Sequence, residues 1–467
     1  MKKGLILGLA GAAFVAGCSA DPLSIPNPNS PTVAGASADP GALQLQATGI
    51  LRQLRGGAGA YITATARFGR EGYIYTPNEG RNTSHYLIGL SGANRLDPAG
   101  FAVGVWAGNY GNRRDIYNFK AVVNASASLS TAQKSAAMGF ARTIDALEML
   151  YVISTRDTLG AVIDIRDIAT ELAPFVSRDS TYRYIIGELN TADTELAAGG
   201  AAFPFALHSG WAGFNTPTTF RQFNRAIAAR ANAYFATRGG GATAYTAASN
   251  ALAASFLNRT AATAAAMNVG VYHVYSTSTG DATNGVGQNA DYLTHPSYAT
   301  DVAVGDLRAS KWTVLGTPRN APQGLGIATS LAMARYATNV TPVPVVRNEE
   351  LLLLDAEVRW FTNDKANALA SLNQVRTISG GLAASPLTIA STDAEFIDAL
   401  LYERRFSLLS EGHRWVDHRR FGRLAQLPLD VTTGNNAHFR AVVMPIPQGE
   451  CLVRARANDA TLAGPGC

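Results

Sequence analysis

The sequence has little net charge and very little lysine. Its 39 lysines and arginines outnumber the 34 acidic residues by five, and loss of Lys2 and Lys3 with an N-terminal leader would reduce that excess to three. So small an excess does not indicate nucleic-acid binding, and we expect no nucleic-acid partner. Only six of the basic residues are lysines. Together with abundant alanine and glycine, this indicates a compositional bias of the genome rather than a basic binding surface.

Common catalytic and metal-binding motifs are also missing. The sequence contains no H-E-x-x-H, no P-loop and no G-x-S-x-G. His413 and His418 are five positions apart, which turns them by about 140° on a helix, so we expect no joint metal ligation and place them at the surface or in a second layer. Asp355 and Glu357 could be imagined as a glycosidase pair, but they fall in a predicted helical core that a sugar would not reach. The sequence therefore predicts no cofactor, no metal and no enzyme.

After its first 17 residues, the sequence has no apolar run long enough to span a bilayer. Residues 1–17 combine two lysines, an apolar run and small residues, which is typical of a secretory signal peptide. The adjoining Val15-Ala16-Gly17-Cys18 resembles the bacterial lipobox, in which the peptide is cut before Cys18 and that cysteine is acylated. Ser19, in place of aspartate, indicates the outer membrane. The alternative is an ordinary signal peptide followed by a chance cysteine.

The body of the protein is predicted to follow a tether. Residues 18–40 are rich in proline, serine and asparagine, so we expect an extended and mobile segment. Hydrophobic residues make up 47% of the sequence and charged residues 16%, which permits a large core. We assign residues 41–467 to a single domain. Near its end, Cys451 and Cys467 could form a disulfide in an oxidising compartment, but the spacing alone does not decide it.

Helical periodicity dominates the first half of this domain. Ser130, three residues before Gln133, has the spacing of a capping box and predicts a helix that runs to about Thr155. Successive helices of this length indicate tetratricopeptide-like packing, although no 34-residue repeat is evident. The predicted helices are 42–55, 104–126, 131–155, 179–198, 218–238 and 243–256.

Residues 258–344 change character. They are rich in Gly, Thr, Asn and Pro with few apolar periods, so we expect a loop-rich insertion that faces a ligand. Sugar rings stack on Tyr and Trp faces, while planar polar side chains bind hydroxyl groups. Two clusters of aromatic residues are therefore candidates for ligand contact, with an ordinary core role as the alternative. They are Tyr73, Tyr75 and Tyr86 near the N-terminus, and Tyr292, Tyr298 and Trp312 in the insertion.

Residues 345–467 contain three predicted helices with an unusual number of charges. The first, 347–361, carries Leu351, Leu354 and Val358 on one face, while Leu352 and Leu353 extend the apolar surface around it. The second lies in 363–382. The third begins after Thr392, which has a capping-box spacing to Glu395, and stops at Gly412. Buried charges must pair, so we predict a structural ion-pair network of Glu357, Arg376, Glu403, Arg404, Glu411, Arg414 and Asp417.

The order of motifs in this region resembles the C-terminal signature of the SusD/RagB family. The motifs are R-x-E-E-x-x-L-x-x-A-E, L-N-x-V-R and E-R-R-x-x-L-x-x-E-G-x-R-W-x-D-x-R-R. The matching positions are Arg347, Glu349, Glu350, Ala356, Glu357, Leu372, Asn373, Val375, Arg376, Glu403, Arg404, Glu411, Gly412, Arg414, Trp415, Asp417 and Arg420. A second element, from Arg142 to Ile163, resembles the family less completely, because Val162 stands at a usual proline position.

The resemblance implies a fold and a function. The fold would be all-α and SusD-like, with tetratricopeptide-type helix pairs and long irregular loop insertions. The protein would be an outer-membrane lipoprotein that binds an oligosaccharide and delivers it to a SusC-like TonB-dependent transporter. Alternatives are a binder of peptides or other polymers, a surface glycosidase, and a scaffold without a small ligand.

Overall fold

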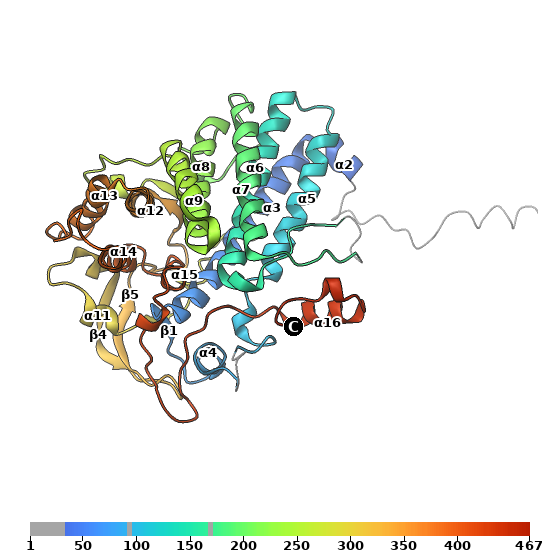
Figure 1. The fold of residues 1–467 in the computed structure, drawn as a ribbon. Coiled ribbons are helices and arrows are strands. Elements are labelled where there is room, and N and C mark those ends of the chain that lie inside the picture. Colours follow the sequence, from blue (N-terminus) through green and yellow to red (C-terminus); the bar gives the residue numbers. More distant parts are fainter. Residues whose placement is uncertain (1–32, 91–95, 167–170) are drawn as a thin grey trace, which may run out of the picture.

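The computed structural model describes residues 33–90, 96–166 and 171–467 of the chain. Helices dominate these residues, and two small sheets lie among them (Figure 1). The prediction of a mostly helical fold is therefore confirmed. The leader, Cys18 and most of the tether lie outside the described residues, so the structure does not bear on their predicted roles.

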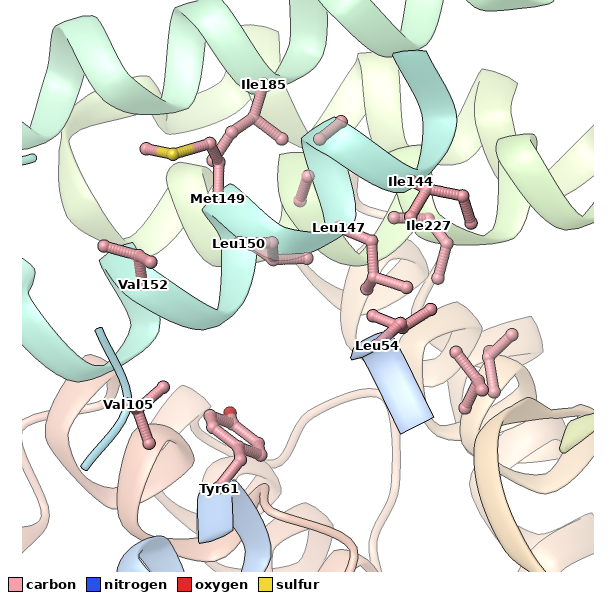
Figure 2. Packing of buried hydrophobic residues seen from close by; sticks show 14 of the residues in the cluster. Leu54, Tyr61, Val105, Ile144, Leu147, Met149, Leu150, Val152, Ile185 and Ile227 are labelled. Atoms are coloured by element: carbon pink, nitrogen blue, oxygen red, sulfur yellow. The ribbon is translucent and has the colours of Figure 1, made fainter. Parts of the chain in front are cut away.

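The first half is a series of packed helices. Helices α5 to α9 each contact the next one along the chain, and α3 contacts α5 and α6. Helix α6 begins with the predicted capping box of Ser130 and Gln133. Alanines and large aliphatic side chains fill the space between these helices, including Leu54 from α3 and Leu147 and Leu150 from α6 (Figure 2). The helices are α2 (Val33–Ala38), α3 (Pro40–Phe68), α4 (Arg81–Thr83), α5 (Ala107–Ala125), α6 (Thr131–Arg156), α7 (Arg178–Ala197), α8 (Pro217–Phe235) and α9 (Gly241–Ala253).

Two predictions for the N-terminal region are corrected. Residues Val33–Ala38, assigned to an extended tether, form helix α2, which contacts α3 and α5. Helix α3 continues to Phe68 rather than ending near Arg55. The Gly-Gly pair after Arg55 favours a helix end by propensity, but packing of Ile62, Ala66 and Phe68 in the main core holds the helix together through it.

Residues 258–344 contain more regular structure than a loop-rich insertion would. They supply most strands of two antiparallel sheets, one with the order β1-β3-β5-β4 and one of β2 with β6. The prediction missed these strands because most have five residues or fewer, and because β1 and β2 pair with segments that lie far away in sequence. The elements are β1 (Gly72–Ile74), α10 (Ala264–Met267), β2 (Gly270–His273), β3 (Tyr292–Thr294), α11 (Ser297–Asp301), β4 (Trp312–Arg319), β5 (Thr329–Met333) and β6 (Val343–Arg347).

Helix α12 lies between two hydrophobic clusters. Its Leu351, Leu354 and Val358 pack in the main core, while Leu352, Leu353 and Trp360 pack in a second cluster with α13 and α14. Burial on more than one side, expected from the sequence, is thus confirmed. The C-terminal helices are α12 (Asn348–Phe361), α13 (Lys365–Ile378), α14 (Asp393–Ser407), α15 (Arg414–Arg420) and α16 (Gln448–Arg456).

The third predicted helix is shorter than expected, and a separate helix follows its predicted end at Gly412. Helix α14 has the predicted cap of Thr392 and Glu395 but ends at Ser407, and α15 begins at Arg414. Between them Ser410 and Gly412 have φ values of 55° and 87°, which a helix does not permit. A Cβ at Gly412 would lie 2.3 Å from the ring of Tyr61. Glycine is therefore needed here for both the backbone conformation and the close approach of α3.

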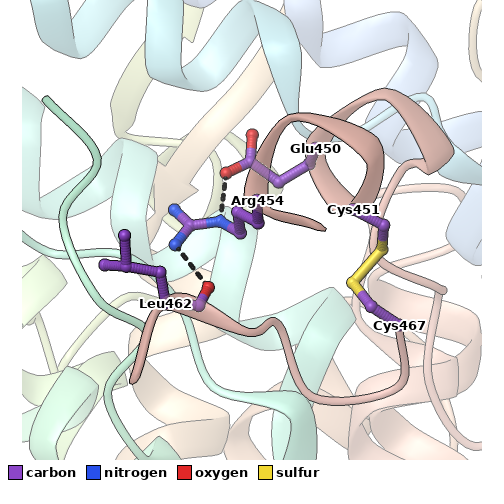
Figure 3. Close-up of a disulfide and its surroundings, with 5 residues drawn as sticks. All are labelled: Glu450, Cys451, Arg454, Leu462 and Cys467. Atoms are coloured by element: carbon purple, nitrogen blue, oxygen red, sulfur yellow. Dashed lines mark hydrogen bonds and ion pairs between the residues drawn. A yellow bond between two sulfur atoms is a disulfide. The ribbon is translucent and has the colours of Figure 1, made fainter. Parts of the chain in front are cut away.

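The C-terminal segment forms a small closed lobe. Cys451 on α16 and Cys467 are joined in a disulfide, with Cα atoms 5.5 Å apart (Figure 3). Arg454 donates to the carbonyl oxygens of Leu462 and Ala173, at 3.0 and 2.9 Å. The bond to Leu462 lies within the lobe, and the bond to Ala173 attaches the lobe to the segment that precedes α7.

Within residues 33–90, 96–166 and 171–467, no helix has the length and apolar character needed to cross a membrane.

Candidate functional site

The two predicted aromatic clusters meet in the four-stranded sheet. Strand β1, which carries Tyr73, pairs with β3, where Tyr292 lies opposite Ile74. The rings of Tyr298 and Trp312 are 5.7 Å apart at a steep angle. The fold therefore brings together residues that are more than 200 positions apart in the sequence, although Tyr86 lies to one side.

All six of these aromatic residues are buried, with at most 7% of their surface exposed. Their hydroxyl groups mostly have internal partners: Tyr73 donates to Asp430 at 2.6 Å, Tyr86 to the Phe101 carbonyl at 3.0 Å, and Tyr292 contacts Ser410 at 2.8 Å. In this conformation the rings of Tyr73, Tyr75, Tyr86, Tyr292, Tyr298 and Trp312 have no face open to solvent on which a sugar could stack. Their role in ligand contact stays a prediction that the structure does not support.

The charged residues of the C-terminal helices form buried ion pairs. Glu357 pairs with Arg420, which also contacts Asp417 at 2.9 Å, and Arg404 contacts Asp417 at 2.7 Å. Arg376 contacts Glu403 at 2.7 Å, and Glu411 contacts Arg347 at 2.9 Å. Arg414 differs from the other predicted members. It has no carboxylate partner among the described residues, and its guanidinium group lies 5.6 Å from the ring of Tyr298.

Some partners in this network come from outside the C-terminal region. Arg230 on α8 donates to both oxygens of Glu350, at 2.7 and 2.6 Å, and Arg308 contacts Glu403. The sequence shows Glu350 and Glu403 as motif residues but contains no signal that identifies Arg230 as the distant partner of Glu350 or Arg308 as that of Glu403. The network joins α8, the middle insertion and α12 to α15. Among the described residues, no group of three or more His, Cys, Asp or Glu side chains could hold a metal ion.

His413 and His418 are buried inside this region rather than at the surface, with 7% and 5% exposure. His413 Nδ1 lies 2.9 Å from the hydroxyl of Tyr234, and His418 Nδ1 lies 2.9 Å from the carbonyl oxygen of Arg414. Burial lowers the pKa of each histidine to about 4, so both rings are neutral at physiological pH. Of the two placements expected from the sequence, the surface is thus wrong and the second layer fits, because the short α15 is enclosed by α3, α14 and the C-terminal segment.

A pocket of about 300 Å³ lies between α3, α5 and α6. Two tyrosine rings, Tyr61 and Tyr151, form part of its wall, with centroids 4.6 Å apart. Tyr61 lies near Leu54 and Val105, which also line the pocket (Figure 2). The polar side chains in the lining are Gln53, Asn109 and Glu148. We call this volume the α3–α5–α6 pocket.

Glycines open the mouth of the α3–α5–α6 pocket. Gly56 and Gly57 in α3 and Gly104 and Gly108 beside the start of α5 all line it, and all four are exposed. A Cβ built at Gly56, Gly57 or Gly108 would meet no atom within 4 Å, so close packing does not explain these glycines. Glycine inside a helix costs about 1 kcal/mol relative to alanine. The pair in α3 therefore keeps space open at a cost in stability.

Glu148 is the charged group of this pocket. Its carboxylate accepts hydrogen bonds from the side-chain amides of Asn109 and Asn112, both at 2.6 Å, and it has no ion-pair partner among the described residues. Only 3% of the residue is exposed. Burial raises the pKa of Glu148 to about 7, since the two amide donors only partly replace the lost water.

A smaller inner pocket continues from the same wall. It shares Ala58, Tyr61 and Tyr151 with the α3–α5–α6 pocket and reaches Arg230 and His413. Its free volume is about 20 Å³, which is room for about one water molecule. A small organic ligand therefore fits only in the outer part.

Two larger hollows occur near the C-terminal lobe. One, of about 690 Å³, is lined by α16 and the final residues, and the other, of about 400 Å³, lies between α5 and residues 162–166 and 171–173. In the second, Arg454 is paired with Glu450, and the hydroxyl of Tyr110 is bonded to the backbone of Val162. Because these groups have internal partners, the α3–α5–α6 pocket offers the better arrangement for recognition of a small ligand.

Sequence reasoning did not identify the residues of the α3–α5–α6 pocket. They come from three helices, and no motif links them. Two weak signals exist: the Gly56-Gly57 pair inside a helical pattern, and Glu148 among the apolar residues of α6. Both break the local pattern, which is a known sign of a functional position. Flat tyrosine faces, amides and a carboxylate together are suited to bind a small hydroxylated molecule.

The C-terminal part of the chain matches a known protein family. Residues 306–452 match the model of the SusD family. No curated protein matches this chain at a significant level.

Solved structures share the fold over most of the chain. NanU from B. fragilis has a TM-score of 0.67 at 14% identity, with 94% of this chain and 98% of that chain covered. A SusD superfamily protein from Parabacteroides distasonis has a TM-score of 0.66 at 13% identity, with 91% and 98% covered. A SusD-like carbohydrate binding protein from Bacteroides vulgatus has a TM-score of 0.59 at 16% identity, with 82% and 83% covered. The predicted SusD-like fold is thereby confirmed.

Proposed function

We propose that this chain, which has the SusD-family region at residues 306–452 within a SusD fold, is the ligand-binding subunit of an outer-membrane uptake complex. In this proposal a lipid on Cys18 anchors the protein to the outer membrane, with its body at the cell surface. The body captures an oligosaccharide and delivers it to a SusC-like TonB-dependent transporter.

The observation that carries this proposal is the fold match along 94% of the chain together with the family match in its C-terminal third. The protein from Bacteroides vulgatus with the same fold is described as a SusD-like carbohydrate binding protein. The sequence adds the lipobox-like Val15-Ala16-Gly17-Cys18 at its N-terminus. These features support a binder held at a membrane by acyl chains.

We place ligand contact in the α3–α5–α6 pocket and on the exposed part of the middle insertion. The pocket supplies Tyr61, Tyr151 and the polar groups around Glu148. The insertion supplies strand β4, which is the edge strand of its sheet and is mostly exposed from Thr313 to Arg319. In this proposal the six buried aromatic residues of the two predicted clusters do not contact the ligand, and they contribute to the shape of the fold around this sheet.

Catalysis of glycoside hydrolysis is less well supported. Most glycosidases need two carboxylic groups on either side of the sugar bond. The α3–α5–α6 pocket contains one, Glu148, and the nearby Glu350 and Glu411 are engaged by Arg230 and Arg347. Reducing-sugar release by the purified protein, abolished by a Glu148→Gln substitution, would favour the enzyme instead.

The proposal is tested by purification of the tagged protein from detergent-solubilised outer membranes. We expect a large TonB-dependent barrel to copurify with the lipidated protein. A matched preparation with Cys18→Ala controls for the lipid anchor. Absence of a barrel under mild conditions, with the anchor intact, would contradict the transport role and leave a stand-alone surface binder.

A further inference from the structure

The side chains that line the α3–α5–α6 pocket present hydrogen-bond acceptors and no cation. The lining contains no lysine, arginine or histidine. Asn109 donates its amide nitrogen to Glu148, and Gln53 donates its own to Asp115. Because a carboxylate only accepts hydrogen bonds, each amide must turn its NH₂ group toward the acid and keep its carbonyl oxygen for another partner.

Those carbonyl oxygens have no donor among the described residues. Neither Oδ1 of Asn109 nor Oε1 of Gln53 accepts a hydrogen bond in the described part of the chain, and Glu148 has only the two amide donors. The wall also includes the rings of Tyr61 and Tyr151. Aromatic faces attract cations, and a buried carboxylate without a cation is costly. The unpaired acceptor oxygens favour a ligand with many hydrogen-bond donors. The aromatic faces and the uncompensated carboxylate favour a ligand with a positive charge.

The charged residues around Glu148 do not supply the missing cation. Arg113 on α5 is engaged by Asp145 at 2.9 Å, and Arg230 on α8 is engaged by Glu350. The acid at Asp145 further disfavours a charged Glu148, as the burial of the carboxylate itself does. A bound ammonium group would therefore be the first cation in direct contact with this carboxylate.

We propose that the α3–α5–α6 pocket binds a sugar that carries a free amino group, with the ammonium group at Glu148 and the sugar ring against Tyr61 and Tyr151. This inference rests on the proposed ligand-binding function and names the substrate class. The ammonium group donates to Glu148 and to the carbonyl oxygens of Asn109 and Gln53. The glycines at the mouth leave room for the rest of the sugar.

The test is calorimetric titration of the purified protein with glucosamine, with glucose as the uncharged comparison. We expect glucosamine to bind and glucose to bind at least about tenfold more weakly, which is the scale of a hydrogen bond to a charged group. Glu148→Gln keeps the shape and removes the charge, and should reduce glucosamine affinity by a similar factor. Equal affinities for the two sugars, or an unaffected Glu148→Gln variant, would overturn the proposal.

A second variant tests the place of binding without removing a buried group. Gly57→Leu should block the mouth of the α3–α5–α6 pocket and abolish glucosamine binding. Gly49→Leu is its matched control: Gly49 lies in the same helix, a Cβ there also meets no atom within 4 Å, and it does not line the pocket. Because leucine favours helix over glycine, both variants should stay folded. Equal binding by the two leucine variants would place the ligand elsewhere.

The failure of this inference is distinct from failure of the proposed function. If the barrel copurifies but glucosamine does not bind, the transport role stands and the amino-sugar assignment is wrong. If glucosamine binds at the pocket but no barrel copurifies, the assignment stands and the transport role is wrong.

Discussion

At the scale of single residues, the buried carboxylates of this protein fall into two groups that differ in their partners. Glu350, Glu357 and Asp417 each face an arginine, so their charge is compensated inside the protein. Glu71 and Glu148 have mainly neutral hydrogen-bond partners, and burial raises the pKa of each to about 7. The first group stabilises contacts between helices, and the second makes stability depend on pH.

Arg420 illustrates the first group. It is buried, donates to Glu357 at 2.6 Å and contacts Asp417 at 2.9 Å. Arg420→Met should reduce the free energy of unfolding by about 3–5 kcal/mol, because two carboxylates would lose their shared cation while remaining buried. Urea denaturation followed by circular dichroism measures the loss.

Arg423→Met is the matched control for this substitution. Arg423 contacts Asp398 at 3.2 Å, but the side chain of Asp398 is 53% exposed. A solvated pair of this kind contributes at most about 1 kcal/mol. Similar losses for Arg420→Met and Arg423→Met would show that the buried network contributes no more than a surface ion pair.

Glu71 illustrates the second group. One oxygen accepts from the backbone N–H of Ser410 at 3.0 Å and from Tyr298 at 3.3 Å, while the other has no partner. Its pKa is about 7 in the folded protein against 4.5 when unperturbed. Between these two values the folded state holds a proton that the unfolded state releases, so stability falls as pH rises from 4.5 to 7 and is constant on either side.

Glu71→Gln should remove this pH dependence at its source. The difference between the two pKa values corresponds to about 3 kcal/mol. The change in the free energy of unfolding caused by the substitution should therefore be more stabilising at pH 8 than at pH 4 by up to that amount. Chemical denaturation of both proteins at several pH values measures the difference. If the change in unfolding free energy is the same at both ends of the range, the acid titrates in the folded protein as it does in the unfolded chain.

At the scale of elements, the C-terminal lobe depends on its disulfide more than on a core. Helix α16 has few buried residues, and its attachment to the body includes the bond from Arg454 to the carbonyl oxygen of Ala173. The disulfide closes the 16-residue separation between Cys451 and Cys467. A closed loop of about 15 residues contributes about 3 kcal/mol by the chain-entropy argument.

Replacement of both Cys451 and Cys467 by serine should therefore open the lobe without unfolding the body. Hydrogen exchange should quicken across α16 and residues 457–467, while exchange in α6 stays unchanged. The observation that would contradict this is equal protection of α16 in the serine variant and the parent protein, which would mean that Arg454 alone holds the lobe.

The helices were more predictable than the strands, and the reason is local. The cap of α6 at Ser130 and Gln133 and the cap of α14 at Thr392 and Glu395 lie within four residues of sequence, so local chemistry fixes them. Strand β1 has three residues, and its partner strand starts at Tyr292. Such a pairing depends on packing between distant segments, which periodicity does not reveal.

At the scale of the whole molecule, the fold was likewise more predictable from the sequence than the candidate site. The ordered motifs from Arg347 to Arg420 carry the family resemblance, because the buried ion pairs that they form restrict the residue types allowed there. The α3–α5–α6 pocket combines Gln53, Asn109 and Glu148 from three helices. No short pattern joins these residues, so only the folded chain shows that they face one volume.

The predicted anchor links the molecule to its place in the cell. Cys18 follows an apolar leader, and residues 19–31 contain four prolines, so the body, which begins at helix α2, would sit at the end of a lipidated tether. Cys18→Ala should shift the protein from the membrane fraction to the soluble fraction after cell lysis, because no acyl chain can then be attached. Ser19→Ala keeps the cysteine and serves as the control. A Cys18→Ala protein that stays in the membrane fraction would show that the body binds the membrane or its transporter without the lipid, and the anchor would then be unnecessary for assembly.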